Sequence, residues 1–115
     1  MIIISWYNDI GDIMIKAIEI MINSGVIITY NCFISYTDKI CYLNDKKYEV
    51  TDDFLNNIKK IILYWKNEYG TNNLIDTEEF TIIVHTTEGQ DKYHGKGIYP
   101  DNYRLLKEML GDLHG

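Results

Sequence analysis

At 115 residues the chain has room for one domain with one hydrophobic core, and we predict a single α+β domain over residues 1–115. The net charge is −6, from 17 acidic and 11 basic side chains. This balance argues against nucleic-acid binding, because neutralising phosphates requires clustered Lys and Arg. An acidic chain favours a basic protein partner instead.

The sequence gives no indication of a membrane partner. No apolar run approaches the roughly 20 residues that cross a bilayer. The start, Met1–Trp6, lacks the basic region of a signal peptide, so a cytoplasmic protein is expected. Whether residues 1–6 are strand or helix stays open. Cys32 and Cys41 are predicted to be buried free thiols, too far apart along their strands for a disulfide.

The first predicted helix covers Asp9–Asn23. Its polar residues recur three and four positions apart and form one narrow stripe: Asp9, Asp12, Lys16, Glu19 and Asn23. The rest of this segment is apolar, over an arc wider than one sheet face can cover. Either the helix is deeply buried or part of it contacts another chain. A structural homodimer formed through this helix is therefore one alternative function.

The remaining chain reads twice as a hairpin followed by a helix, over Val26–Trp65 and again over Phe80–Leu113. The first hairpin is predicted to turn at Asp38-Lys39 and the second at Glu88-Gly89. The predicted strands are Val26–Tyr36, Ile40–Val50, Phe80–Thr87 and Gln90–Gly97. Alternation assigns one face to the core: Cys32, Ile34, Tyr36, Cys41, Leu43, Phe80, Ile82, Val84 and Tyr93.

The helix of the first unit has a well-marked start. Thr51 is a good N-cap, and Asp52 and Asp53 follow in the first turn, where the helix dipole favours carboxylates. Its apolar arc continues through Trp65 and Tyr69, and Gly70 ends it. A loop over Thr71–Glu78 follows.

The last helix is predicted to start near Pro100. It points these side chains inward: Leu105, Leu106, Met109, Leu110 and Leu113. The whole pattern predicts an α+β fold with two ββα units, which form a mainly antiparallel four-stranded sheet with three helices packed on it.

The sharpest candidate for chemistry lies on the outer face of the second hairpin. With a turn at Glu88-Gly89, His85 lies opposite Lys92, and His94 becomes a diagonal neighbour of His85. Two imidazoles beside an ammonium could act as base, acid and anion stabiliser in phosphodiester cleavage. A small phosphodiesterase or ribonuclease is therefore a second alternative. A metal site would need Asp91, which alternation sends to the opposite face, so no metal or other cofactor is expected.

The leading hypothesis is a non-enzymatic protein-binding module, because no nucleophile motif, phosphate loop or dinucleotide fingerprint is present. Ten tyrosines support it, since tyrosine gives interfaces a large rigid contact area with a polar tip. Its most specific form is a small acidic immunity or antitoxin-type inhibitor, of bacterial or phage origin, that blocks a basic, nuclease-like enzyme. The candidate partner-binding residues are Tyr42, Asp45, Tyr64, Glu78, Glu79 and Tyr99.

Overall fold

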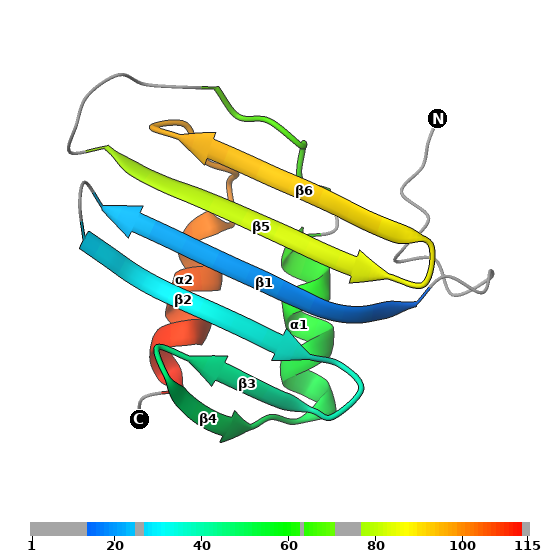
Figure 1. Ribbon diagram of the computed structural model, residues 1–115. Helices are drawn as coiled ribbons and strands as arrows, with labels where there is room; N and C mark the ends of the chain where they lie inside the picture. Colours follow the sequence, from blue (N-terminus) through cyan, green and yellow to red (C-terminus); the bar gives the residue numbers. More distant parts are fainter. Residues whose placement is uncertain (1–13, 25–26, 63, 71–76, 114–115) are drawn as a thin grey trace.

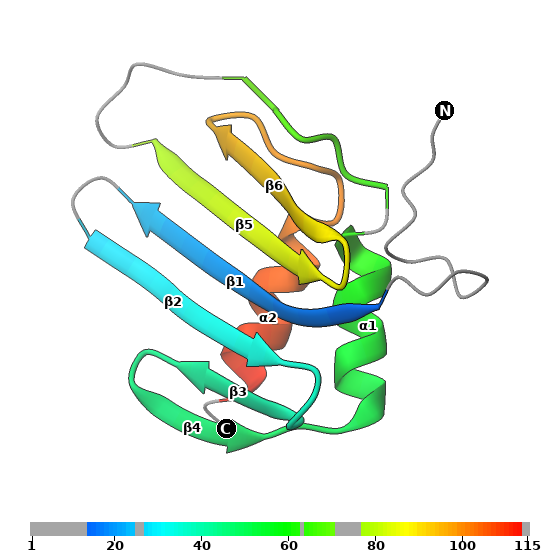
Figure 2. The same ribbon diagram turned by 45° about the vertical axis from the view of Figure 1, so that its right-hand side comes forward.

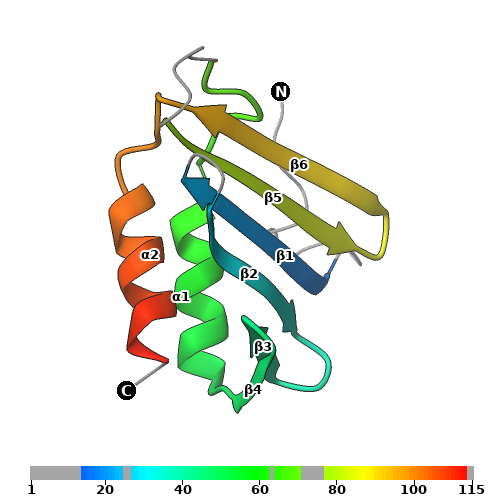
Figure 3. The same cartoon turned by 60° about the vertical axis from the view of Figure 1, so that its left-hand side comes forward.

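The computed structural model describes residues 14–24, 27–62, 64–70 and 77–113. Over these residues the fold is one six-stranded sheet with two helices on one of its faces (Figures 1 and 3). The elements are β1 (Ile15–Ser24), β2 (Ile27–Ser35), β3 (Ile40–Leu43), β4 (Lys46–Glu49), α1 (Asp52–Ile62), β5 (Glu78–Thr86), β6 (Gly89–Lys96) and α2 (Tyr103–Asp112). The strand order is β4-β3-β2-β1-β5-β6, and each neighbouring pair is antiparallel. The prediction of four strands and three helices is therefore wrong.

The largest correction concerns the predicted first helix. Residues Ile15–Ser24 form β1, which lies between β2 and β5 in the middle of the sheet, and the start of the predicted helix, Asp9–Ile13, lies outside the described residues. Ile18, Ile20 and Ile22 alternate into the core and are fully buried there. A β-branched side chain fits a pleated, packed strand better than a helix. The polar spacing that suggested a helix is therefore incidental, and the homodimer through that helix loses its basis.

The two hairpins form, but both registers differ from the predicted ones by two positions. Cys41 lies opposite Ile34 rather than Tyr36, and His85 lies opposite Gln90 rather than Lys92. Because side chains alternate with a period of two, an even shift leaves every residue on its predicted face. The predicted core side chains of both hairpins therefore do point toward the helices.

The corrected register changes the relationship between the two cysteines. Cys32 and Cys41 are diagonal neighbours on adjacent strands, and their sulfur atoms lie 3.3 Å apart in the core. The predicted separation is therefore wrong, although both thiols are free and buried as expected. The hydrogen bond with Cys41 and burial in the core raise the pKa of the Cys32 thiol.

The predicted long strand Ile40–Val50 is two strands. Asn44 and Asp45 adopt positive φ angles of 49° and 71°, and Leu43 pairs with Lys46 across them. Two consecutive positive φ values are typical of the tight turn that matches the twist of a hairpin. The side chain of Asn44 supports this turn by accepting a hydrogen bond from the backbone N–H of Asn31 at 2.8 Å.

Helix α1 begins as predicted and ends early. The Thr51 hydroxyl accepts a hydrogen bond from the backbone N–H of Phe54 at 3.1 Å, which confirms the N-cap. The helix ends at Ile62 instead of continuing to Gly70. Residues 67–70 lie along β6, where the backbone N–H of Tyr69 donates to the carbonyl of His94 and the N–H of His94 donates to that of Asn67, both at 2.9 Å. Pairing with the sheet replaces the helical hydrogen bonds.

Helix α2 begins at Tyr103, three residues after Pro100. Leu106 and Leu110 are buried as predicted, but Leu105 is 48% exposed and the inward face includes Tyr103. Tyr103 joins an aromatic cluster that fills the core between the helices and β5. Its ring lies 5.1 Å from Phe80 and 4.8 Å from Tyr99, in a stacked arrangement with the latter.

Both edges of the sheet are protected against pairing with another strand. Residues 67–70 cover part of the outer edge of β6. The other edge, β4, is only four residues long and carries Lys46 and Lys47. Short, charged or covered edges resist strand addition, so the sheet offers a partner its face rather than its edge.

Candidate functional site

The face of the sheet opposite the helices is not covered by any described element, as the views from two further angles show (Figures 2 and 3). Three large apolar side chains are exposed there, Met21 at 46%, Phe33 at 41% and Tyr42 at 44%. Phe33 on β2 lies directly opposite Tyr42 on β3, and Met21 on β1 is the diagonal neighbour of Phe33. We call this surface the open face and these three residues its apolar centre.

The strand pairing sets the order of side chains across the open face. One row crosses all six strands, because each residue in it lies directly opposite the next: Lys47, Tyr42, Phe33, Glu19, Ile83 and Lys92. The apolar pair Phe33 and Tyr42 thus lies between Lys47 on one side and Glu19 on the other. The open face carries charges of both signs around an apolar centre, an arrangement found in protein interfaces.

Beside Phe33 the open face is hollowed. The hollow has a volume of about 520 Å³, and its lining comes from β1, β2, β5 and β6: Lys16, Ala17, Glu19, Phe33, His85, Thr86, Gly89 and Gln90. Ala17 forms part of its floor and is 8% exposed. A small residue at this position, next to a bulge in β1, leaves the space that larger neighbours would fill.

His85 lies in this hollow and is held on both sides. Its Nε2 is 2.5 Å from the Oε2 of Glu19, and its Nδ1 is 3.4 Å from the Nε2 of Gln90. A ring nitrogen this close to a carboxylate oxygen donates its N–H to it. The imidazole therefore orients the Glu19 side chain.

His94 lies elsewhere on the same face and contacts two carboxylates. Its Nε2 is 2.6 Å from Glu79, and its Nδ1 is 3.2 Å from Glu68. The hydrogen bond to Glu79 is the largest cause that raises the pKa of His94 above its ordinary value, partly opposed by burial and aided by Glu68. This cluster joins β5, β6 and the segment that covers the β6 edge.

The structure does not bring the two histidines together. His94 lies opposite Thr81 and His85 opposite Gln90, so they are four residues apart along the strands, about 14 Å at roughly 3.4 Å per residue. Lys92 occupies the row between them. Asp91 pairs with Val84, a core residue, and the alternation therefore places it away from both histidines. No group of three His, Cys, Asp or Glu side chains within the described part of the chain is arranged to hold a metal.

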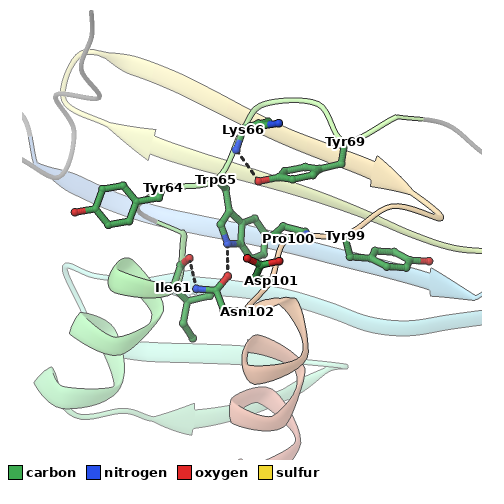
Figure 4. Close-up of a pocket in the computed structure, with 9 residues that line it drawn as sticks. All are labelled: Ile61, Tyr64, Trp65, Lys66, Tyr69, Tyr99, Pro100, Asp101 and Asn102. Atoms are coloured by element: carbon green, nitrogen blue, oxygen red, sulfur yellow. Dashed lines mark hydrogen bonds between the residues drawn. The ribbon is translucent and has the colours of Figure 1, made fainter.

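A second concavity lies where α1 ends and α2 begins (Figure 4). This aromatic pocket has a volume of about 420 Å³, and four aromatic side chains contribute to its lining: Ile61, Tyr64, Trp65, Lys66, Tyr69, Tyr99, Pro100, Asp101 and Asn102. Its polar groups already bond to one another, since the hydroxyl of Tyr69 accepts from the backbone N–H of Lys66 at 2.8 Å. The indole N–H of Trp65 likewise donates to Asn102 at 2.6 Å. The bond between Trp65 and Asn102 links the segment after α1 to the residue before α2.

The six predicted partner-binding residues do not form one surface. Tyr42 and Glu79 lie on the open face, on strands β3 and β5. Asp45 lies in the turn before β4, at the margin of the sheet. Tyr64 is 82% exposed and lines the aromatic pocket, away from the open face.

The other two predicted residues make internal contacts. The Glu78 carboxylate accepts hydrogen bonds from the Tyr103 hydroxyl at 2.5 Å and the Lys107 ammonium at 3.0 Å. Burial and Glu78 together raise the pKa of Tyr103. The hydroxyl of Tyr99 donates to the backbone carbonyl of Glu78 at 2.7 Å. Both side chains therefore fasten α2 and the preceding loop to β5.

Sequence reasoning missed three residues of the open face. Glu19 and Met21 fall within the predicted helix Asp9–Asn23, and Phe33, on the predicted outer face of the first hairpin, is not among the predicted partner-binding residues. The signal was present in β1, where Ile18, Ile20 and Ile22 alternate with Glu19 and Met21. Strict alternation of this kind predicts a strand with one core face and one outer face.

Comparison with known proteins gives no relative from which a role can be transferred. No protein-family model, no curated protein and no solved structure matches the chain. None of the described helices is long and apolar enough to cross a membrane.

Proposed function

We propose that this chain is a non-enzymatic protein-binding module that engages its partner with the open face of the sheet. The observation that carries the proposal is the apolar centre, where Met21, Phe33 and Tyr42 are each more than 40% exposed and adjacent. Contiguous apolar groups rimmed by polar ones are typical of interaction surfaces, and aromatic residues dominate interface energies. In its most specific form, the module is an immunity or antitoxin-type inhibitor of a basic enzyme.

The basic character of the partner rests on the overall charge. A net charge of −6 attracts a basic protein over distances longer than any single contact. The open face itself is mixed, because Glu19, Glu49 and Glu79 lie among lysines. We therefore expect the association rate to fall as salt rises, while the dissociation rate depends mainly on the apolar centre.

The two alternative functions, a phosphodiesterase or ribonuclease and a structural homodimer, receive less support. A phosphodiesterase that uses His85 and His94 together would need them close, and they lie in different rows of the sheet. The homodimer was argued from a helix that is the strand β1. A cytoplasmic location stays a prediction from the sequence.

The experiment compares capture by matched variants. Tagged wild-type protein, a double variant Phe33→Ser/Tyr42→Ser and a control Tyr64→Ser are each incubated with lysate of the source cells, and retained proteins are identified by mass spectrometry. Tyr64 is the appropriate control because it is an exposed aromatic residue outside the open face. The proposal predicts a stoichiometric basic partner that the wild type and the control retain and the double variant loses. A partner retained equally by all three would overturn it, as would the absence of any partner.

A further inference from the structure

The hollow beside Phe33 has the chemistry to take a guanidinium group. We propose that it is the binding site for an arginine side chain of the protein partner. This inference rests on the proposed function, since it names the chemical group through which a basic partner is anchored on the open face. The site combines an exposed aromatic ring, an oriented carboxylate and a recess of about 520 Å³ next to them.

The ring and the carboxylate are placed for one planar cation. Phe33 and Glu19 lie directly opposite each other on β2 and β1, so their side chains emerge from the same face at the spacing of a cross-strand pair. Phe33 is 41% exposed and the Glu19 side chain 43% exposed, which leaves both accessible. A guanidinium can stack on an aromatic face while it donates hydrogen bonds in its own plane to a carboxylate.

The carboxylate is oriented before any ligand arrives. His85 contacts Oε2 of Glu19 at 2.5 Å, and Gln90 contacts the other nitrogen of the imidazole. The contact with His85 uses Oε2, and the carboxylate has a second oxygen, Oε1, that can accept from a ligand. An oriented acceptor loses less rotamer entropy on binding than a mobile one, and preorganisation of this kind increases affinity.

Arginine fits this hollow better than lysine. A guanidinium offers several donors in a fixed fork and a flat surface for the ring, whereas an ammonium is a compact, strongly hydrated charge. The side-chain carbonyl of Gln90, which also lines the hollow, adds a neutral acceptor.

Lys16 makes it possible to test the sign of the ligand's charge. This exposed side chain also lines the hollow, and it would repel an arginine but attract an anion. An arginine site predicts opposite effects at two positions, with Glu19→Gln weakening binding and Lys16→Met strengthening it. An anion site predicts the reverse of both. Glu49→Gln provides a matched control, because Glu49 lies opposite Ile40 and does not line the hollow.

The experiment titrates ¹⁵N-labelled protein with the capped tripeptide Gly-Arg-Gly and follows amide chemical shifts. The citrulline peptide, which has the same shape without the charge, and the lysine peptide are the comparison probes. We expect shifts centred on Glu19, Phe33 and His85 with the arginine peptide, at least several-fold tighter than with lysine. Glu19→Gln should weaken binding about tenfold, the effect of losing one charge-assisted hydrogen bond, and Glu49→Gln should leave it unchanged.

Equal shifts with citrulline, no shifts up to the solubility limit of the arginine peptide, or tighter binding by Glu19→Gln would each overturn the arginine site. These outcomes are separable from failure of the proposed function. If the arginine peptide does not bind while Phe33→Ser/Tyr42→Ser still loses the captured partner, the open face is the interface and only the proposed arginine site is wrong.

Discussion

The indole N–H of Trp65 donates a hydrogen bond to the side-chain carbonyl of Asn102, with a nitrogen–oxygen distance of 2.6 Å. The amide nitrogen of Asn102 donates in turn to the backbone carbonyl of Ile61 at 2.9 Å, near the end of α1. Asn102 immediately precedes α2 but makes no side-chain capping bond to it, because its amide is used in these two contacts. One side chain therefore fastens the end of one helix to the start of the other.

Replacing this amide should destabilise the fold. Asn102→Ala leaves the Trp65 N–H without its partner in a side chain that is only 5% exposed, and an unsatisfied buried donor costs about 1–3 kcal/mol. We expect a loss of about 2 kcal/mol in the free energy of unfolding, measured by urea denaturation. Asn56→Ala, at an exposed position of α1, is the control and should change stability by less than about 0.5 kcal/mol. Equal effects of the two substitutions would contradict this role.

Two glycines should respond to alanine with opposite signs. A Cβ at Gly95 would lie 2.6 Å from the Phe80 ring and 2.8 Å from the backbone carbonyl of Ile98, which has little freedom to move. Gly95→Ala should therefore cost about 2–3 kcal/mol through overpacking. A Cβ at Gly111 in α2 meets its nearest neighbour at 3.5 Å, so Gly111→Ala should stabilise the helix by about 0.5 kcal/mol. Thermal and urea unfolding of both variants check this pair, and a stable Gly95→Ala would disprove the tight packing.

The cluster around His94 should make stability depend on pH. The carboxylates of Glu79 and Glu68 raise the pKa of His94 above its unfolded value. A raised pKa means that the folded state holds the proton more tightly, so its stabilisation is fully present below the unfolded pKa, about 6.5, and is lost as pH rises through the folded pKa. Glu79→Gln should therefore destabilise the protein more at about pH 5.5 than at about pH 8.5.

Urea denaturation of the wild type and Glu79→Gln at both pH values measures this difference. Glu49→Gln, a carboxylate in a different row of the same face, should show no such pH dependence. A loss of stability in Glu79→Gln that is the same at both pH values would show that the ion pair with His94 contributes nothing that depends on protonation.

The parts of the fold that could be predicted are those set by local patterns. The Thr51 cap of α1 is predictable because its hydroxyl and the following carboxylates act within one helical turn. The core faces of both hairpins were found because alternation is local, and a register error of two positions does not change a face. The part of the open face that the two hairpins contribute is therefore predictable, and it includes Tyr42, Ile83, His85 and Lys92.

The remaining errors come from contacts between distant segments. β1 alternates at Ile18, Ile20 and Ile22, but the three- and four-position spacing of its polar residues competes with that signal. Pairing with β2 and β5 on both sides decides for the strand, and neither partner is visible in the local pattern. The end of α1 depends on hydrogen bonds between residues 67–70 and β6, which lie more than twenty positions further along the chain. The pairing of Glu19 with Phe33, and hence the hollow, could not be proposed while β1 was read as a helix.

The claim that the open face is the interface is tested most directly by affinity for the captured partner. Isothermal titration calorimetry would compare the wild type with Phe33→Ser and with the control Tyr64→Ser, after circular dichroism has shown that all three are folded. Truncating a central aromatic anchor typically costs 2 kcal/mol or more, so we predict that Phe33→Ser weakens binding by about thirtyfold or more. Tyr64→Ser should remain within about twofold of the wild type. If Phe33→Ser binds as tightly as the wild type, or if Tyr64→Ser is the weaker variant, the partner binds elsewhere.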